Sequence, residues 1–137
     1  MNLFFKTFFY ILSYDVWFYG THRLMHQAPK DSVRYSIHKI HHATAYSHLS
    51  FQDTHVAHSL ENLITMVGYV WPLVMGMEWD LTSYLLAFVM VSFRGYMKHD
   101  PRCTWVVGHH HLDHHRFTNG NYGEFWIDYL LGTVVSA

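Results

Sequence analysis

Histidines gathered in three short clusters constrain the fold of this chain more than any other feature. The clusters contain eight of its 14 histidines: His22-Arg-Leu-Met-His26, His38-Lys-Ile-His41-His42 and His111-Leu-Asp-His114-His115. On an α-helix, residues three or four positions apart share a face, so each cluster can direct its imidazoles toward one place. A lone histidine pair is commonly a hydrogen-bonded core pair, but three such clusters together predict a metal centre.

Length, composition and charge predict a single domain over residues 1–137 that binds no nucleic acid. Half of the 137 residues are hydrophobic, which suits one helical domain. The formal net charge is −1, and no basic stripe interleaved with aromatic residues attracts a phosphate backbone. Cys103 is the only cysteine, so internal disulfides and cysteine-rich metal sites are excluded.

Three apolar stretches, residues 3–19, 60–77 and 81–97, predict helices that enter a membrane. Their length is marginal against the roughly 20 residues needed for a full crossing, and Pro72 leaves shallow or kinked insertion open. A soluble helical core is the alternative interpretation, which three nearly uncharged stretches with aromatic residues near their ends disfavour. The first stretch lacks the basic start and small-residue cleavage site of a signal peptide.

The charge pattern places all three histidine clusters on one side of the apolar stretches. Glu78 and Asp80 lie between the second and third stretches, at the tip of a predicted helical hairpin. The basic residues that flank the clusters are Arg23, Lys30, Arg34, Lys39, Lys98, Arg102 and Arg116. Because positive residues favour the cytosol, we expect an all-α integral-membrane helical bundle with a cytosolic-side cap of short helices that carry the clusters.

The number of histidines predicts two metal ions. Neutral imidazole suits zinc, copper, iron and nickel, so the ligand type alone does not select the metal. A single zinc takes about four ligands, fewer than eight clustered histidines offer. The His-Glu-x-x-His motif of metalloproteases and the Glu-x-x-His repeat of soluble di-iron bundles are both absent. An all-nitrogen dinuclear site in a membrane setting favours iron and dioxygen chemistry.

Four segments match the signature motifs of one enzyme family. Residues 15–26, 37–42 and 110–115 are similar to its three histidine boxes. The run Asn-Tyr-Gly-Glu-Phe-Trp-Ile-Asp at 121–128, followed by Leu-Gly-Thr at 131–133, is similar to its closing signature. The chain therefore resembles the fatty acid hydroxylase and sterol desaturase superfamily of integral-membrane non-haem di-iron oxygenases, over nearly its whole length.

The resemblance implies two irons as cofactors, dioxygen as co-substrate and a set of histidine ligands. Residue by residue, the ligand role falls on His22, His26, His38, His41, His42, His111, His114 and His115, with His99 as a ninth candidate. Some family members have another histidine where this chain has Gly95, so water or His110 is left to complete the site.

Further polar residues near the boxes have more than one interpretation. Asp15 precedes His22 by about two helical turns and could orient a ligand through its free ring nitrogen; a polar residue facing other chains is the alternative. Asp113 has the same two interpretations. We expect surface, second-shell or packing roles for His48, His55, His58 and His109.

The function that the resemblance implies is oxidation of an unactivated C–H bond of a lipid, in lipid biosynthesis. Hydroxylation of a fatty acid, sterol or sphingolipid is favoured; desaturation by the same centre and an inactive metal- or lipid-binding relative are the alternatives. A metal transporter is disfavoured, because it would string its ligands along a path. The resemblance also implies a membrane lipid substrate, an external electron donor such as cytochrome b5 with its reductase, and an endoplasmic reticulum location. It leaves open whether the protein forms a homo-oligomer. It also leaves open whether the chain is a minimal or a truncated form of the family domain.

Overall fold

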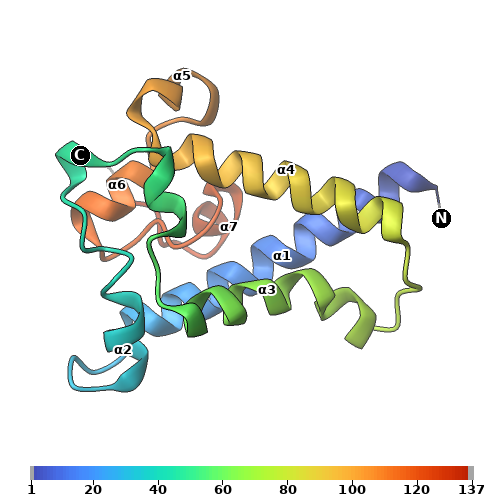
Figure 1. Cartoon of the computed structure of the whole chain (residues 1–137), viewed down its shortest axis with the longest axis horizontal. Coiled ribbons are helices and arrows are strands. Elements are labelled where there is room, and N and C mark those ends of the chain that lie inside the picture. The colour runs from blue at the N-terminus through green and yellow to red at the C-terminus, as the bar shows by residue number, and fades with distance from the viewer. Residues whose placement is uncertain (1, 136–137) are drawn as a thin grey trace.

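The computed structural model describes residues 2–135, which form helices and no strand. The expected all-α fold is therefore confirmed for this part of the chain. Three long helices build a bundle: α1 (Leu3–His26), α3 (Ser59–Val74) and α4 (Leu81–His99). They coincide closely with the three apolar stretches, and α1 packs against both of the others (Figure 1).

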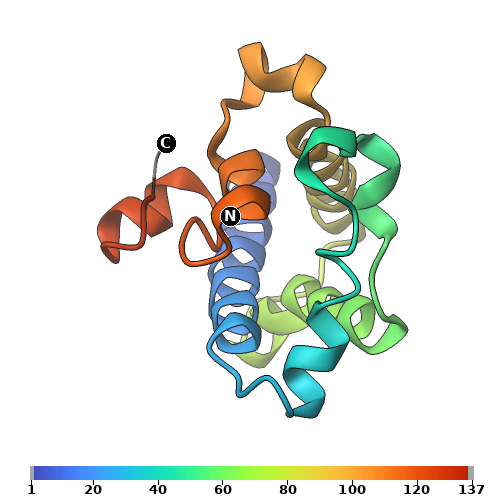
Figure 2. The same ribbon diagram turned by 90° about the vertical axis from the view of Figure 1, so that its left-hand side faces the viewer.

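Short helices gather at the end of the bundle where α1 and α4 finish (Figure 1). They are α2 (Val33–His38), η1 (Tyr46–His48), η2 (Phe51–His55), η3 (Pro101–Cys103), α5 (Thr104–Val107), α6 (His110–Phe117) and α7 (Phe125–Leu130). In Figure 2 this end faces the viewer, and both η2 and α6 contact α4. The short helices therefore surround the bundle end that carries the histidines.

Local sequence explains where these helices begin. The Asn2 side chain accepts from the amide of Phe5, and Ser32 accepts from Tyr35 at 3.2 Å, so each caps a helix start. Asp80 does the same for α4, since its carboxylate accepts from the amide of Ser83 at 2.8 Å. These caps fix where α1, α2 and α4 begin, and each of these three helices ends at a histidine.

Close packing joins α1 to α3. A side chain on Gly68 would place its Cβ 3.0 Å from Trp17, so glycine allows the two helices to approach. Trp17 donates its indole N–H to the Ile64 carbonyl at 2.8 Å, and the rings of Tyr14 and Tyr69 lie 4.4 Å apart. Aromatic contacts thus fix α3 against the middle of α1.

A four-residue charge network joins α1, α4 and the segment before α7. Arg94 donates to both Asp15 and Glu124, and Lys98 donates to Glu124. Two cations thereby face two carboxylates, and none of the four side chains is more than a quarter exposed. The network explains how Asp15, an acid within an otherwise apolar stretch, is accommodated.

The predicted membrane spans find no support in the structure. Within residues 2–135, no helix combines the length and the hydropathy that a membrane crossing requires. The 16 residues of α3 extend only roughly 24 Å, less than a bilayer core of about 30 Å. Polar residues, including Asp15 and Arg94, interrupt the longer helices α1 and α4. Of the expected architecture, the described residues show an all-α bundle with short helices at one end.

Candidate metal centre

Nine histidines converge at the end of the bundle, in two groups that could each hold a metal ion. These two spatial groups differ from the three sequence clusters, which are called histidine boxes from here on. The first cluster comprises His22, His26, His38, His42 and His114, and the second cluster comprises His41, His99, His111 and His115. In each cluster, one ring nitrogen per residue lies within 4.8 Å of all the others. Metal–imidazole bonds of about 2.0–2.1 Å require ligand atoms this close together.

The two clusters adjoin one another: the first combines residues from all three histidine boxes, and the second combines residues from the second and third boxes with His99. Ring centroids of His42 and His115, one from each cluster, lie 4.6 Å apart. Consecutive histidines go to different clusters: His41 and His42 separate, and so do His114 and His115. The expectation that each box points at one place is thus wrong for the second and third boxes, because neighbouring residues cannot project in one direction.

Hydrogen bonds fix the tautomer of four of these rings. The Nδ1 atoms of His22 and His114 lie 2.5 and 2.7 Å from the carbonyl oxygens of Tyr122 and Gly120. In the second cluster, Nδ1 of His41 and His99 lies 3.2 and 2.9 Å from the carbonyl oxygens of Val56 and Gly95. A carbonyl oxygen can only accept, so each Nδ1 bears the proton and each neutral ring presents a bare lone pair at Nε2.

These lone pairs face each other, as the ligands of a shared cation do. Nε2 of His41 lies 3.3 Å from Nε2 of His99, and neither atom has a proton to donate. Nε2 of His38 lies 2.7 Å, 3.0 Å and 3.1 Å from those of His26, His42 and His22. Both ring nitrogens of His115 are buried without a hydrogen-bond partner. A metal ion in each cluster would satisfy these buried acceptors, so the residues fit a pair of ions.

Burial keeps the clustered rings neutral. Desolvation, with repulsion from His38 and His41, lowers the pKa of His26 to about 3. Desolvation also lowers the pKa of His38 and of His99 to about 4. Because the neutral imidazole is the form that binds a metal, these rings are ready to act as ligands at neutral pH.

Two predicted orienting residues lie elsewhere. Asp15 pairs with Arg94, and no hydrogen bond joins it to a histidine in the described residues. Asp113 is partly exposed on α6 and makes no side-chain hydrogen bond within residues 2–135. His110 lies outside both clusters, because its Nε2 pairs with the Asp128 carboxylate at 3.0 Å.

Residues that the sequence pattern did not identify contact the ligand-like histidines instead. Glu61 Oε1 lies 2.7 Å from His38 Nδ1, and burial raises the pKa of this carboxyl to about 7. Thr54 Oγ1 lies 3.2 Å from His99 Nδ1. Glu61 lies on α3, which contains no histidine box. Its contact with His38 becomes visible only because α3 packs beside α2.

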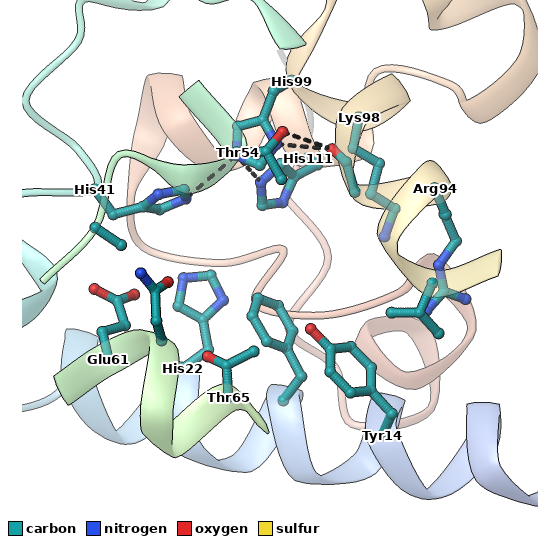
Figure 3. A pocket seen from close by; sticks show the side chains of 15 residues that line it. Tyr14, His22, His41, Thr54, Glu61, Thr65, Arg94, Lys98, His99 and His111 are labelled. Carbon is teal, nitrogen blue, oxygen red and sulfur yellow. Dashed lines mark hydrogen bonds between the residues drawn. The ribbon is translucent and has the colours of Figure 1, made fainter. Parts of the chain in front are cut away.

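Cavities in the described part of the chain reach the histidines. The first, of about 110 Å³, lies among α1, α3 and α4 and is lined by His22, His41, His99 and His111 (Figure 3). Its other walls include Tyr14, Phe18, Thr65, Val91, Arg94 and Lys98. The second, of about 560 Å³, reaches the first cluster at His26, His38 and His42, and is also lined by Lys30 and Lys39.

Fold and site together define an all-α protein with two adjoining histidine clusters that could bind metal. A family model described as fatty acid hydroxylase matches residues 7–133, which is nearly the whole chain. The chain belongs to the fatty acid hydroxylase family, and the family implies an oxidoreductase. Comparisons with curated proteins and with solved structures gave no match.

Proposed function

We propose that this chain is a lipid hydroxylase with a non-haem di-iron centre. The observation that supports the proposal most strongly is the pair of adjoining clusters whose Nε2 lone pairs point inward. In the proposed centre, the first cluster holds one ion with five histidines and the second holds the other with four. Bound there, the two irons would supply the reduction of dioxygen that oxidises an unactivated C–H bond.

The surrounding residues provide binding, orientation and exclusion of water. Carbonyl oxygens hold the rings of His22, His41, His99 and His114 by Nδ1, which directs each Nε2 to an ion. A substrate carbon in the cavity beside His22 and His111 would lie next to both clusters, because residues of each line it. Its volume of about 110 Å³ admits a short segment of a lipid rather than a whole molecule. Desaturation by the same centre is the alternative outcome.

The lipid substrate would reach this cavity from the apolar sides of the bundle. Exposed apolar side chains cover its three long helices: Phe4, Phe5 and Phe8 on α1, Leu63, Met66 and Val70 on α3, and Leu85, Val89 and Phe93 on α4. Exposed apolar side chains on all three long helices favour contact with lipid. We therefore propose shallow insertion of the bundle into a membrane surface, with the histidine end toward water.

An external electron donor completes the proposed reaction. The cavity that reaches His26 and His42 is lined by Lys30 and Lys39, both exposed. Positive side chains at this opening favour an acidic protein donor, as cytochrome b5 would be. Electrons delivered there would enter at the first cluster.

Metal analysis of the detergent-purified protein, expressed with added iron, tests the centre. We expect about two irons per chain, and loss of both in the His41→Ala/His114→Ala double variant, which alters each cluster once. Ser83→Ala, a buried substitution near the start of α4 and far from both clusters, serves as the matched control. Lipid profiling with a donor present should then reveal a hydroxylated product. A folded protein that binds no iron would refute the proposed oxidation, and an unsaturated product would identify a desaturase.

A further inference from the structure

The fully buried side-chain amide of Asn121 holds the segment from Gly120 to Val135 by hydrogen bonds. Asn121 is 0 % exposed and adopts a positive φ of 56°, which asparagine tolerates better than most residues. Its side chain donates to the carbonyls of His110 at 3.1 Å and Val135 at 2.8 Å, and accepts from the Val135 amide at 2.8 Å. Asn121 therefore ties the start of α6 to the end of the described chain.

The buried carboxylate of Asp128 also forms hydrogen bonds within this segment. Asp128 on α7 is 0 % exposed. It accepts from the amides of Tyr122 at 2.9 Å and Gly123 at 2.7 Å, and from the Thr133 hydroxyl at 2.7 Å. His110 Nε2 lies 3.0 Å from Oδ2 of Asp128. A buried carboxylate with four donors holds the backbone at Tyr122 and Gly123 in one conformation.

The backbone held by these two residues contacts the first histidine cluster directly. The carbonyl oxygen of Gly120 accepts from His114 Nδ1, and that of Tyr122 accepts from His22 Nδ1. These carbonyls immediately flank Asn121. The approach is too close for a side chain at position 120, because a Cβ there would lie 2.6 Å from the Thr133 carbonyl oxygen. The position of both acceptors therefore depends on the bonds made by Asn121 and Asp128.

We propose that Asn121 and Asp128 are positioning residues for the metal site of the first cluster. By fixing two carbonyl oxygens, they hold His22 and His114 in the tautomer and orientation that direct Nε2 to the ion. In the second cluster, His41 and His99 are held by other acceptors, the carbonyls of Val56 and Gly95. The inference rests on the proposed metal centre, and it assigns a function to the closing signature of the sequence: orientation of two ligands.

Cobalt titration of two single-cluster backgrounds tests this inference. His99→Ala/His111→Ala leaves only the first cluster intact, and His26→Ala/His42→Ala leaves only the second. In each full-length background, the affinity for Co²⁺ alone is measured by its visible absorption, with and without Asp128→Asn. The amide cannot accept from all the donors that now face the carboxylate.

We expect Asp128→Asn to weaken Co²⁺ binding about 10- to 100-fold in the first-cluster background and by less than about 3-fold in the second. Thr133→Val removes only one donor to Asp128 and should give a smaller loss in the same background, which provides a milder variant if Asp128→Asn does not fold. In the first-cluster background, Asp53→Asn is the matched control, because Asp53 is another buried carboxylate that accepts from Ser50 and Thr44 and lies outside the first cluster.

The outcomes separate this inference from the proposed function. Co²⁺ binding in both parent backgrounds with no effect of Asp128→Asn and Thr133→Val, or with equal losses in both backgrounds, would overturn the positioning role alone. Equal losses would show that the closing segment only stabilises the fold. Failure of both folded parent backgrounds to bind Co²⁺ would overturn the metal centre and this inference with it.

Discussion

Removal of one charge from the network between α1 and α4 should destabilise the protein measurably. Glu124 accepts from both Lys98 and Arg94, and the exposed fractions of the three side chains are 19 %, 15 % and 25 %. Glu124→Gln keeps the shape but leaves three charged groups with a net charge of +1, since only Asp15 remains to oppose two cations.

The size of this effect follows from burial. Loss of one partner from a buried ion pair costs about 3–5 kcal/mol, and partial exposure and the remaining amide acceptor reduce this to about 2–3 kcal/mol. For a chain of this length, the melting temperature should fall by roughly 10 °C. Thermal and guanidinium unfolding of the detergent-purified, metal-free protein, followed by circular dichroism, measures both quantities.

Two further variants make this prediction refutable. Glu78→Gln is the matched control, because Glu78 is exposed and makes no ion pair within the described residues; its effect should stay within about 0.5 kcal/mol. Lys98→Met combined with Glu124→Gln removes the uncompensated cation and should be more stable than Glu124→Gln alone. Equal stability of Glu124→Gln and Glu78→Gln, or a still less stable double variant, would refute the reasoning.

Three other expectations concern the histidine end. The lowered pKa of His38 and His99 means that the unfolded chain binds more protons below pH 6.5, so metal-free protein should lose stability as pH falls from about 6.5 to 4; a urea midpoint unchanged between pH 7.5 and 5 would contradict this. Gly120→Ala would force its Cβ to within 2.6 Å of the Thr133 carbonyl, so a melting temperature several degrees lower is expected, and an unchanged one would show that the backbone adjusts freely. Lys30→Glu should slow reduction of the iron-loaded protein by an acidic donor protein but not by a small neutral reductant, in stopped-flow measurements; equal rates with the donor would place its docking surface elsewhere.

The histidine spacing predicted which residues would meet but not how they would divide. Positions three or four apart on a helix share a face, which is why His22 and His26 enter the same cluster. Adjacent positions differ in direction by about 100° on a helix, so His114 and His115 must separate. Assigning them to particular clusters requires the packing of α6 against α1 and α4, and no local pattern contains that information.

The groups that orient the histidines were the least predictable part of the site. Four of them are backbone carbonyls, which every residue type possesses, so composition and spacing cannot single them out. Asp15 appeared suitable because it precedes His22 by about two turns. Arg94 approaches that face of α1 from α4, however, and a nearby guanidinium is a stronger partner for a buried carboxylate than a neutral ring is.

Orientation of the centre therefore depends on contacts between distant parts of the chain. The first cluster needs the carbonyls of residues 120 and 122, and the second needs those of residues 56 and 95. Asp128 holds the former through α7, while the latter come from the end of η2 and from within α4, two elements that pack together. The Nε2 lone pairs can converge only after these elements have docked, and until an ion binds they repel one another. Metal binding and tertiary packing must therefore stabilise each other, because the ion removes a repulsion that the fold itself creates.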